Sequence, residues 1–115
     1  LAWPQARAGT IRALGVTSPQ RSPSAPEVPP IADTIAGFDA TSWHGLFAPA
    51  GTPRPVVDKM AAEVKRILEM PDTVAKLTDI GAVPSPMTPD QFTAFIAGER
   101  SKWAEVVKAS GATAN

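Results

Sequence analysis

Three residues in one short segment have the side-chain types of a hydrolytic triad: Asp39, Ser42 and His44. Successive side chains of an extended chain point to opposite faces, so Ser42 and His44 share one face and Asp39 lies on the other. A triad needs its carboxylate to orient the imidazole that takes the hydroxyl proton. The sequence also lacks the Gly-x-Ser-x-Gly turn that presents a nucleophile in many hydrolases. We therefore predict no catalytic residues and no enzyme activity.

Two residues of the same segment, Trp43 and His44, carry hydrogen-bonding groups on ring side chains. A Trp on a strand usually packs in a core while its indole N–H finds one acceptor, so core packing is favoured over ligand contact. For His44, the single His, a half-exposed hydrogen-bonding role is favoured over a donor that faces a ligand. The ligand-binding alternative remains open for both.

Two further positions have types suited to holding a ligand. Thr17 and Ser18 follow a predicted strand, at the end where open α/β sheets tend to bind ligands, although simple strand termination explains them as well. Thr52 and Pro53 open a predicted helix, whose free N–H groups attract anions, but ordinary capping by Thr52 is the favoured interpretation.

Composition narrows the function classes. The chain has 115 residues, with eleven basic residues balanced by eleven acidic ones, and neither sign forms a long run, which argues against a nucleic-acid partner. Without Cys and with one His, a metal site is not expected, and no cofactor motif is present. The sequence opens at Leu1 without an initiating Met, so we expect the true N-terminus to lie upstream.

The element pattern indicates an α/β fold with few strands and about three to four helices. Apolar residues predict strands at 11–17 and 40–48, separated by a proline-rich loop and a short helix at 31–36 that Gly37 ends. Two strands alone make a poor sheet. The count itself indicates an incomplete fold.

Three helices are predicted in the second half. The first begins with Thr52 as N-cap and Pro53 at its first position and runs to Pro71, and the second covers 72–80 and ends at Gly81. An extended segment at 83–86 would suit a sheet edge. The last helix begins with a capping box of Thr88 and Gln91 and ends near Gly111.

Several sequence phrases, in a fixed order over nearly the whole chain, resemble the tripartite tricarboxylate transporter solute-binding proteins, the TctC or Bug family. They are Arg12-Ala-Leu-Gly-Val-Thr-Ser18, Pro26-Glu-Val-Pro29, Gly37-Phe38, Ser42-Trp-His-Gly-Leu-Phe-Ala-Pro49 and Gly51-Thr-Pro53. Members of this family are two-lobed periplasmic receptors, larger than this chain, with a ligand cleft between α/β lobes. The resemblance implies that the chain is a C-terminal fragment of a periplasmic-binding-protein type II fold.

The resemblance also implies an organisation and a function. Residues 1–36 would end the second lobe with the proline-rich loop, 37–50 would form a hinge-crossing strand, and 51–115 would form the helical part that packs on the first lobe. The expected function is capture of a small carboxylate in the periplasm for the membrane subunits of the transporter. The residues expected nearest the ligand are Thr17, Ser18, Ser42, Trp43 and His44.

A second hypothesis comes from another class of protein. The chain would be a free-standing interaction domain that completes its sheet by homo-oligomerisation or strand exchange and binds no solute. Both hypotheses predict exposed apolar surface on this chain, because its helices need more sheet than two strands supply. Self-association of the isolated chain is therefore expected.

Overall fold

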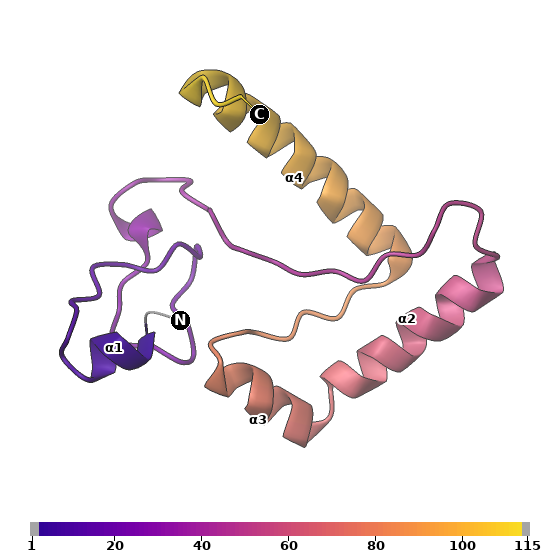
Figure 1. Ribbon diagram of the computed structural model, residues 1–115, viewed down its shortest axis with the longest axis horizontal. Coiled ribbons are helices and arrows are strands. Elements are labelled where there is room, and N and C mark those ends of the chain that lie inside the picture. The colour runs from indigo at the N-terminus through magenta and orange to yellow at the C-terminus, as the bar shows by residue number, and fades with distance from the viewer. Residues whose placement is uncertain (1–2, 114–115) are drawn as a thin grey trace. The chain divides into compact units, whose positions relative to one another are not determined.

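The computed structural model describes residues 3–113, which are mostly helical and irregular (Figure 1). Their helices, in chain order, are α1 (Trp3–Arg7), the 3-10 helix η1 (Ile31–Asp33), α2 (Arg54–Leu68), α3 (Pro71–Asp79) and α4 (Pro89–Ser110). The chain forms two compact units. The first unit comprises residues up to Ala48 and Leu68–Pro84, and the second comprises Pro49–Ile67 and the residues from Ser85 onward.

The first unit is built around three short segments that meet side by side. Val16 and Pro30 form an isolated parallel bridge, in which the Val16 N–H donates to the Pro29 carbonyl at 3.0 Å and its carbonyl accepts from Ile31 N–H at 3.0 Å. On the neighbouring residue, the Thr17 carbonyl accepts from Ala40 N–H at 3.0 Å. Successive residues of an extended chain direct their backbone groups to opposite sides. Residues 16–17 are therefore flanked on both sides, as in the centre of a small sheet.

The predicted strands at 11–17 and 40–48 are nevertheless wrong for the described chain. Within residues 3–113 the only β pairing is the Val16–Pro30 bridge. Residues 38–48 run as a long uncoiled segment without turn or bend (Figure 1), and 83–86 is likewise irregular. An apolar, extended sequence becomes a strand only when other strands lie beside it to accept its hydrogen bonds. The described chain supplies none beyond the bridge.

A small hydrophobic core lies in the proline-rich loop, next to the Val16–Pro30 bridge. Ala25 and Val28 are the buried hydrophobic residues of the described chain, and Pro30 is buried beside them. Arg21 ties the loop together, because its Nη1 donates to the Pro26 carbonyl at 3.0 Å and its guanidinium lies 3.9 Å from the Asp33 carboxylate. Backbone and side-chain contacts thus hold the predicted proline-rich loop together.

Two short helices differ from the sequence expectation. The structure has α1 at Trp3–Arg7, where no helix was predicted, because a helix of five residues is too short to show a repeating apolar face. The expected helix at 31–36 is the shorter η1, followed by a turn. Gly37 ends that turn with a φ of 78°, a left-handed conformation that glycine adopts without steric cost, as predicted.

The start of α2 also differs from the prediction. The helix begins at Arg54, and the Pro53 carbonyl accepts from Val56 N–H at 2.9 Å. The residue directly before the helix is Pro53 and not the predicted Thr52, and the Thr52 hydroxyl donates to the Pro49 carbonyl in the preceding turn at 2.8 Å. The helix is amphipathic, with its apolar residues along one face, but none of its residues is buried.

The last two helices confirm their predicted ends. Pro71 opens α3, and Gly81 follows it with a φ of 80°. Thr88 and Gln91 form the predicted capping box of α4: Gln91 N–H donates to the Thr88 hydroxyl at 3.2 Å, and Thr88 N–H donates to Gln91 Oε1 at 2.9 Å. Gly111 ends α4 in a left-handed conformation. Local chemistry alone fixes these boundaries.

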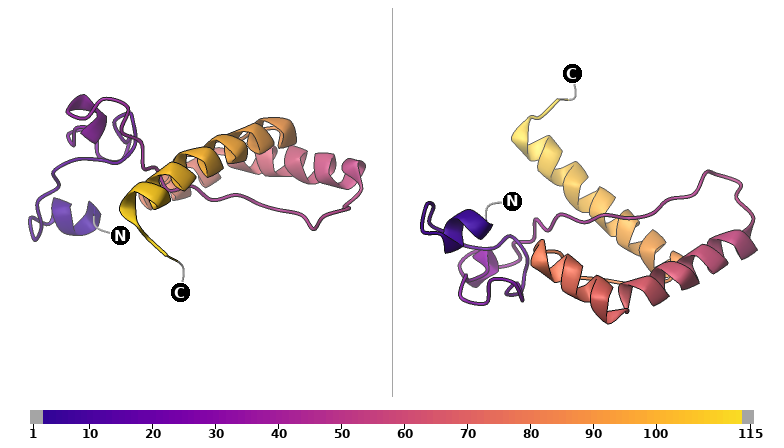
Figure 2. Two further views of the ribbon diagram at one scale, coloured as in Figure 1. Left: turned by 90° about the horizontal axis from the view of Figure 1, so that it is seen from above. Right: turned by 60° about the horizontal axis from the view of Figure 1, so that its bottom comes forward.

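Within the second unit, the first turn of α4 lies beside α2, and both views of Figure 2 show the two helices meeting at that end. Arg54 of α2 makes the connection through its guanidinium, which lies 2.7 Å from Asp58 and 3.3 Å from Asp90. Large apolar side chains remain exposed in both units, as expected for this chain. The most exposed are Leu14, Ile80, Leu46, Phe47, Val83 and Ile35. In the described residues, no helix is both long and apolar enough to cross a membrane.

Candidate ligand site

One backbone hydrogen bond connects the segments that carry the two groups of predicted site residues in the first unit. Thr17 and Ser18 follow the Val16 bridge, and the hydrogen bond from Ala40 N–H to the Thr17 carbonyl holds the start of the 40–48 segment against them. Ser42, Trp43 and His44 follow two to four residues later. The sequence placed these groups near one another only through a family resemblance. One backbone hydrogen bond now links them physically.

The side chains of this region are accessible. Thr17, Ser42 and His44 are exposed, and 37% of the Trp43 surface is accessible to solvent. Ser18 is half-buried and uses its hydroxyl locally, donating to the Gln20 carbonyl at 2.7 Å. Core packing was the favoured prediction for Trp43, but in the described chain its side chain is partly exposed.

Asp39, the acidic member of the triad-like set, is engaged by its neighbour. Its Oδ1 accepts from Thr41 N–H at 3.0 Å and from the Thr41 hydroxyl at 2.6 Å. The carboxylate thus stabilises the entry to the 40–48 segment. This geometry gives Asp39 a structural use that does not involve the imidazole of His44.

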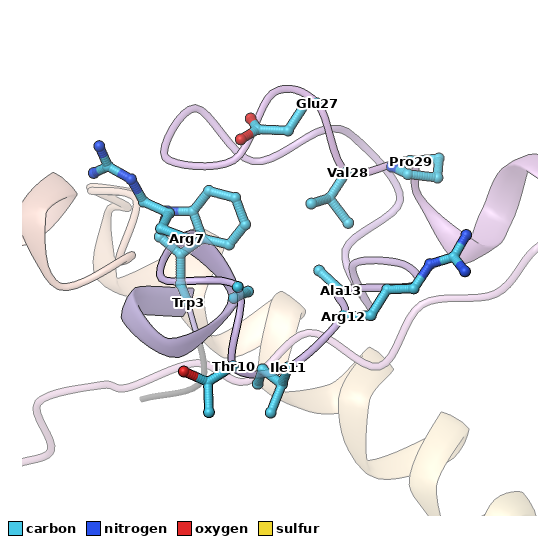
Figure 3. Close-up of a pocket in the computed structure, with 11 residues that line it drawn as sticks. Trp3, Arg7, Thr10, Ile11, Arg12, Ala13, Glu27, Val28 and Pro29 are labelled. Atoms are coloured by element: carbon cyan, nitrogen blue, oxygen red, sulfur yellow. The ribbon is translucent and has the colours of Figure 1, made fainter.

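A broad hollow of about 860 Å³ lies elsewhere in the first unit and was not predicted (Figure 3). It lies between α1, the chain that follows it and the end of the proline-rich loop, with Trp3 and Val28 among its apolar residues. Arg7, Arg12 and Glu27 bring charges to its rim. In Figure 3 the two guanidinium groups point away from one another, so they do not form a converging anion site. None of the predicted site residues lines this hollow.

A smaller hollow of about 240 Å³ belongs to the second unit. Ala61 and Lys65 of α2 face Met87 and Gln91 across it, next to the ion pairs of Arg54. Hydrogen bonds to Asp58 first, and then to Asp90, raise the pKa of Arg54 above its ordinary value. Arg54 itself does not line the hollow, and its guanidinium already has two carboxylate partners.

Among residues 3–113, no three His, Cys, Asp or Glu side chains gather closely enough to hold a metal ion. The described residues around Thr17 and His44 can supply a set of hydrogen-bond donors: hydroxyls, an indole N–H and an imidazole. Such donors suit the oxygens of a small polar solute.

Two solved structures have a fold similar to that of this chain. The structure of Rpa4515 from R. palustris with adipate superimposes with a TM-score of 0.81 at 32% identity, covering 96% of this chain and 37% of that one. The periplasmic binding protein BugD gives a TM-score of 0.79, also at 32% identity, over 96% of this chain and 38% of its own. The fold is that of part of a two-lobed binding protein.

Residues 1–112 match the tripartite tricarboxylate transporter family receptor, and the chain belongs to that family. A UPF0065 protein encoded between tcbD and tcbE in Pseudomonas sp. strain P51 is 38% identical over 84% of this chain. BugT of Bordetella pertussis is 36% identical over 92% of it. The chain spans 30% and 33% of the lengths of these two relatives.

Proposed function

We propose that this chain is part of an extracytoplasmic solute-binding protein that captures a small carboxylate for a tripartite tricarboxylate-type transporter. Membership of the receptor family supports the general role, and the similar Rpa4515, which was solved with adipate, supports a carboxylate as ligand. Periplasmic location and the membrane subunits as partners follow from the same family. Binding leaves the solute chemically unchanged, in keeping with the neutral donors near His44.

The proposal divides the chain by role. Residues 1–36 end the second lobe, 37–50 cross the hinge, and 51–115 pack on the first lobe of the complete receptor. Thr17, Ser18, Ser42, Trp43 and His44 lie at the cleft. The single observation that carries this assignment is the hydrogen bond from Ala40 to Thr17, because it joins the two sets of residues at the end of the bridged segment.

The electrostatics near these residues favour a neutral mode of carboxylate recognition. From Ala40 to Pro53 the sequence has no charged side chain, and Asp39 is hydrogen-bonded to Thr41. Hydroxyl, indole and imidazole N–H groups donate to a carboxylate without needing a fixed cation. The hydrocarbon part of the ligand then lies against the ring of Trp43.

The test begins with the intact mass of the native gene product from its source cells. A product much larger than these 115 residues agrees with a receptor, and the complete product is then assayed by thermal shift with a panel of mono- and dicarboxylates. Adipate is compared with adipamide, its neutral diamide of similar size. Stabilisation by a carboxylate but not by its amide is the expected result.

Two results would overturn the proposal. One is a native mass equal to that of this chain, which would favour the free-standing interaction domain. The other is a cleanly folded complete product that no carboxylate of the panel stabilises. The exposed apolar side chains of this chain are the observation that supports the alternative, a free-standing interaction domain.

A further inference from the structure

Between Ala40 and Pro53, His44 is the sole side chain that can acquire a positive charge near neutral pH. That stretch contains no Lys, Arg, Asp or Glu, and His44 is the single His of the chain. An imidazole changes its charge between about pH 5 and 8, whereas hydroxyl and indole groups stay neutral there. Among the residues proposed to lie at the cleft, His44 is therefore the one whose contact with a ligand can vary with pH.

The backbone puts His44 on the same face of the chain as Ser42. No turn or bend interrupts residues 38–48, and side chains of an extended chain alternate between two faces. Positions two apart lie about 7 Å from one another along such a chain, so one carboxylate ligand can contact both side chains. The hydrogen bond from Ala40 N–H to the Thr17 carbonyl connects the start of this stretch to Thr17 and Ser18.

The charged groups of the neighbouring segments are engaged elsewhere. Asp39 accepts two hydrogen bonds from Thr41, and alternation puts it on the face opposite His44. Arg21 lies 3.9 Å from Asp33. The remaining charged residues of the first unit are Arg7, Arg12, Glu27, Glu69, Asp72, Lys76 and Asp79. In the part of the chain that the structure describes, no hydrogen bond or ion pair joins any of these groups to His44.

A carboxylate and a proton favour one another when both bind at an imidazole. The protonated ring donates a charge-assisted hydrogen bond, roughly twice as strong as the bond from the neutral ring. A carboxylate within about 4–6 Å in turn favours the charged form of the ring. The two effects are reciprocal, because coupling between two binding equilibria acts equally on both. A ligand carboxylate at His44 would therefore bind more tightly as the pH falls from 8 to 6.

We propose that His44 is a specificity-determining residue of the receptor, whose imidazole contacts a carboxylate of the solute and takes up a proton from solvent as the solute binds. The inference rests on the proposed function, since it needs a carboxylate in the cleft. No covalent bond to the solute forms or breaks. Protonated His44 strengthens the preference for a carboxylate over its neutral amide, and this preference grows toward lower pH.

Isothermal titration calorimetry of the complete gene product with adipate tests the proposal at pH 6, 7 and 8. Another carboxylate of the panel that stabilises the product takes the place of adipate if adipate does not bind. The dissociation constant is expected to be about three- to tenfold lower at pH 6 than at pH 8, tenfold corresponding to a change of one unit in proton affinity. Titrations at pH 7 in two buffers of different ionisation enthalpy are expected to show uptake of a fraction of a proton.

Two variants assign the pH dependence to His44. H44Q keeps an N–H donor that cannot gain a charge, so its dissociation constant is expected to be the same at pH 6 and pH 8, without proton uptake. S42A is the matched variant, because it removes a donor that does not titrate from the same face. It is expected to weaken binding by a similar factor at each pH and to keep the pH dependence of the unmodified protein.

The outcomes separate this inference from the proposed function. A dissociation constant that is equal at pH 6 and 8 in the unmodified protein overturns the role of His44 and leaves carboxylate capture intact. An H44Q protein with the unmodified pH profile does the same. A folded product that binds no carboxylate of the panel overturns the proposed function, and this inference with it. Circular dichroism checks folding, and H44N replaces H44Q if that variant does not fold.

Discussion

The guanidinium of Arg54 on α2 binds the carboxylate of Asp90 in the first turn of α4, with 3.3 Å between Nη1 and Oδ1, although 36 residues separate the two in the sequence. The same guanidinium donates through Nε to Asp58 at 2.7 Å, one turn along α2. Asp90 also lies where a carboxylate complements the positive end of the helix dipole of α4. This ion-pair network links the two long helices of the second unit.

The first prediction concerns that network. R54M is expected to lower the melting temperature slightly at low salt, because it removes both ion pairs of an exposed guanidinium. The difference is expected to disappear near 1 M salt, where the screening length falls to about 3 Å. R66M is the matched control, since Arg66 pairs with Glu63 on the same helix at 2.9 Å. Equal losses for the two variants would show that linking α2 to α4 adds no stability.

The second prediction concerns the capping box of α4. T88A removes the hydroxyl that accepts from Gln91 N–H and is expected to destabilise the helix by about 1 kcal/mol, whereas T88S keeps the oxygen and most of the stability. Urea unfolding followed by circular dichroism measures the difference. T93A, inside the same helix, is the control and is expected to be neutral or slightly stabilising. A neutral T88A would mean that α4 does not depend on its cap.

The third prediction compares two glycines. A Cβ at Gly98, inside α4, would meet nothing within 4 Å, so G98A is expected to stabilise the helix by about 0.5–1 kcal/mol. A Cβ at Gly15 would lie 2.9 Å from Ile31 Cγ1 and 3.4 Å from the Pro29 carbonyl oxygen. G15A is therefore expected to disturb the bridge next to it. Faster hydrogen exchange at the amides of Val16 and Ile31 would show this, and unchanged exchange in G15A would contradict the close approach.

The fourth prediction tests the proposed ligand residues in the complete gene product. S42A and H44A each remove one hydrogen-bond donor and are expected to weaken carboxylate binding by roughly 0.5–1.5 kcal/mol per hydrogen bond, which reduces the thermal shift that the carboxylate causes. S101A is the control, because the Ser101 hydroxyl donates to the Ala97 carbonyl within α4. If all three variants respond to the carboxylate alike, Ser42 and His44 do not contact it.

The helix ends were predictable wherever the deciding atoms are neighbours in the sequence. Thr88 and Gln91 cap α4 through bonds across three residues, and Gly81 and Gly111 end their helices through their own φ angles. The predicted start of α2 was wrong by one residue: the helix begins at Arg54 after Pro53, and Thr52 lies in the preceding turn, where its hydroxyl donates to the Pro49 carbonyl.

Whether the predicted strands and the candidate site form depends on hydrogen-bond partners from distant parts of the chain, which a short stretch of sequence does not reveal. Residues 11–17 and 40–48 have the composition of strands, yet within residues 3–113 only Val16 finds a bridge partner. The link between the segment of Ser42, Trp43 and His44 and Thr17 is the hydrogen bond from Ala40, which lies 23 positions after Thr17 in the sequence. The broad hollow beside Trp3 was missed because the short helix α1 that forms one side of it has no periodic signal.

The sequence by itself determined the family, the helices α2 to α4 and their ends at Gly81 and Gly111, because these follow from ordered motifs and from contacts within a few residues. Only the tertiary structure decided that Val16, Pro30 and Ala40 meet, that Arg54 reaches Asp90, and that segment 41–48 lies exposed. Those outcomes require chain segments that are distant in sequence to lie side by side, and backbone pairing between distant segments depends on which partners are there to accept the bonds.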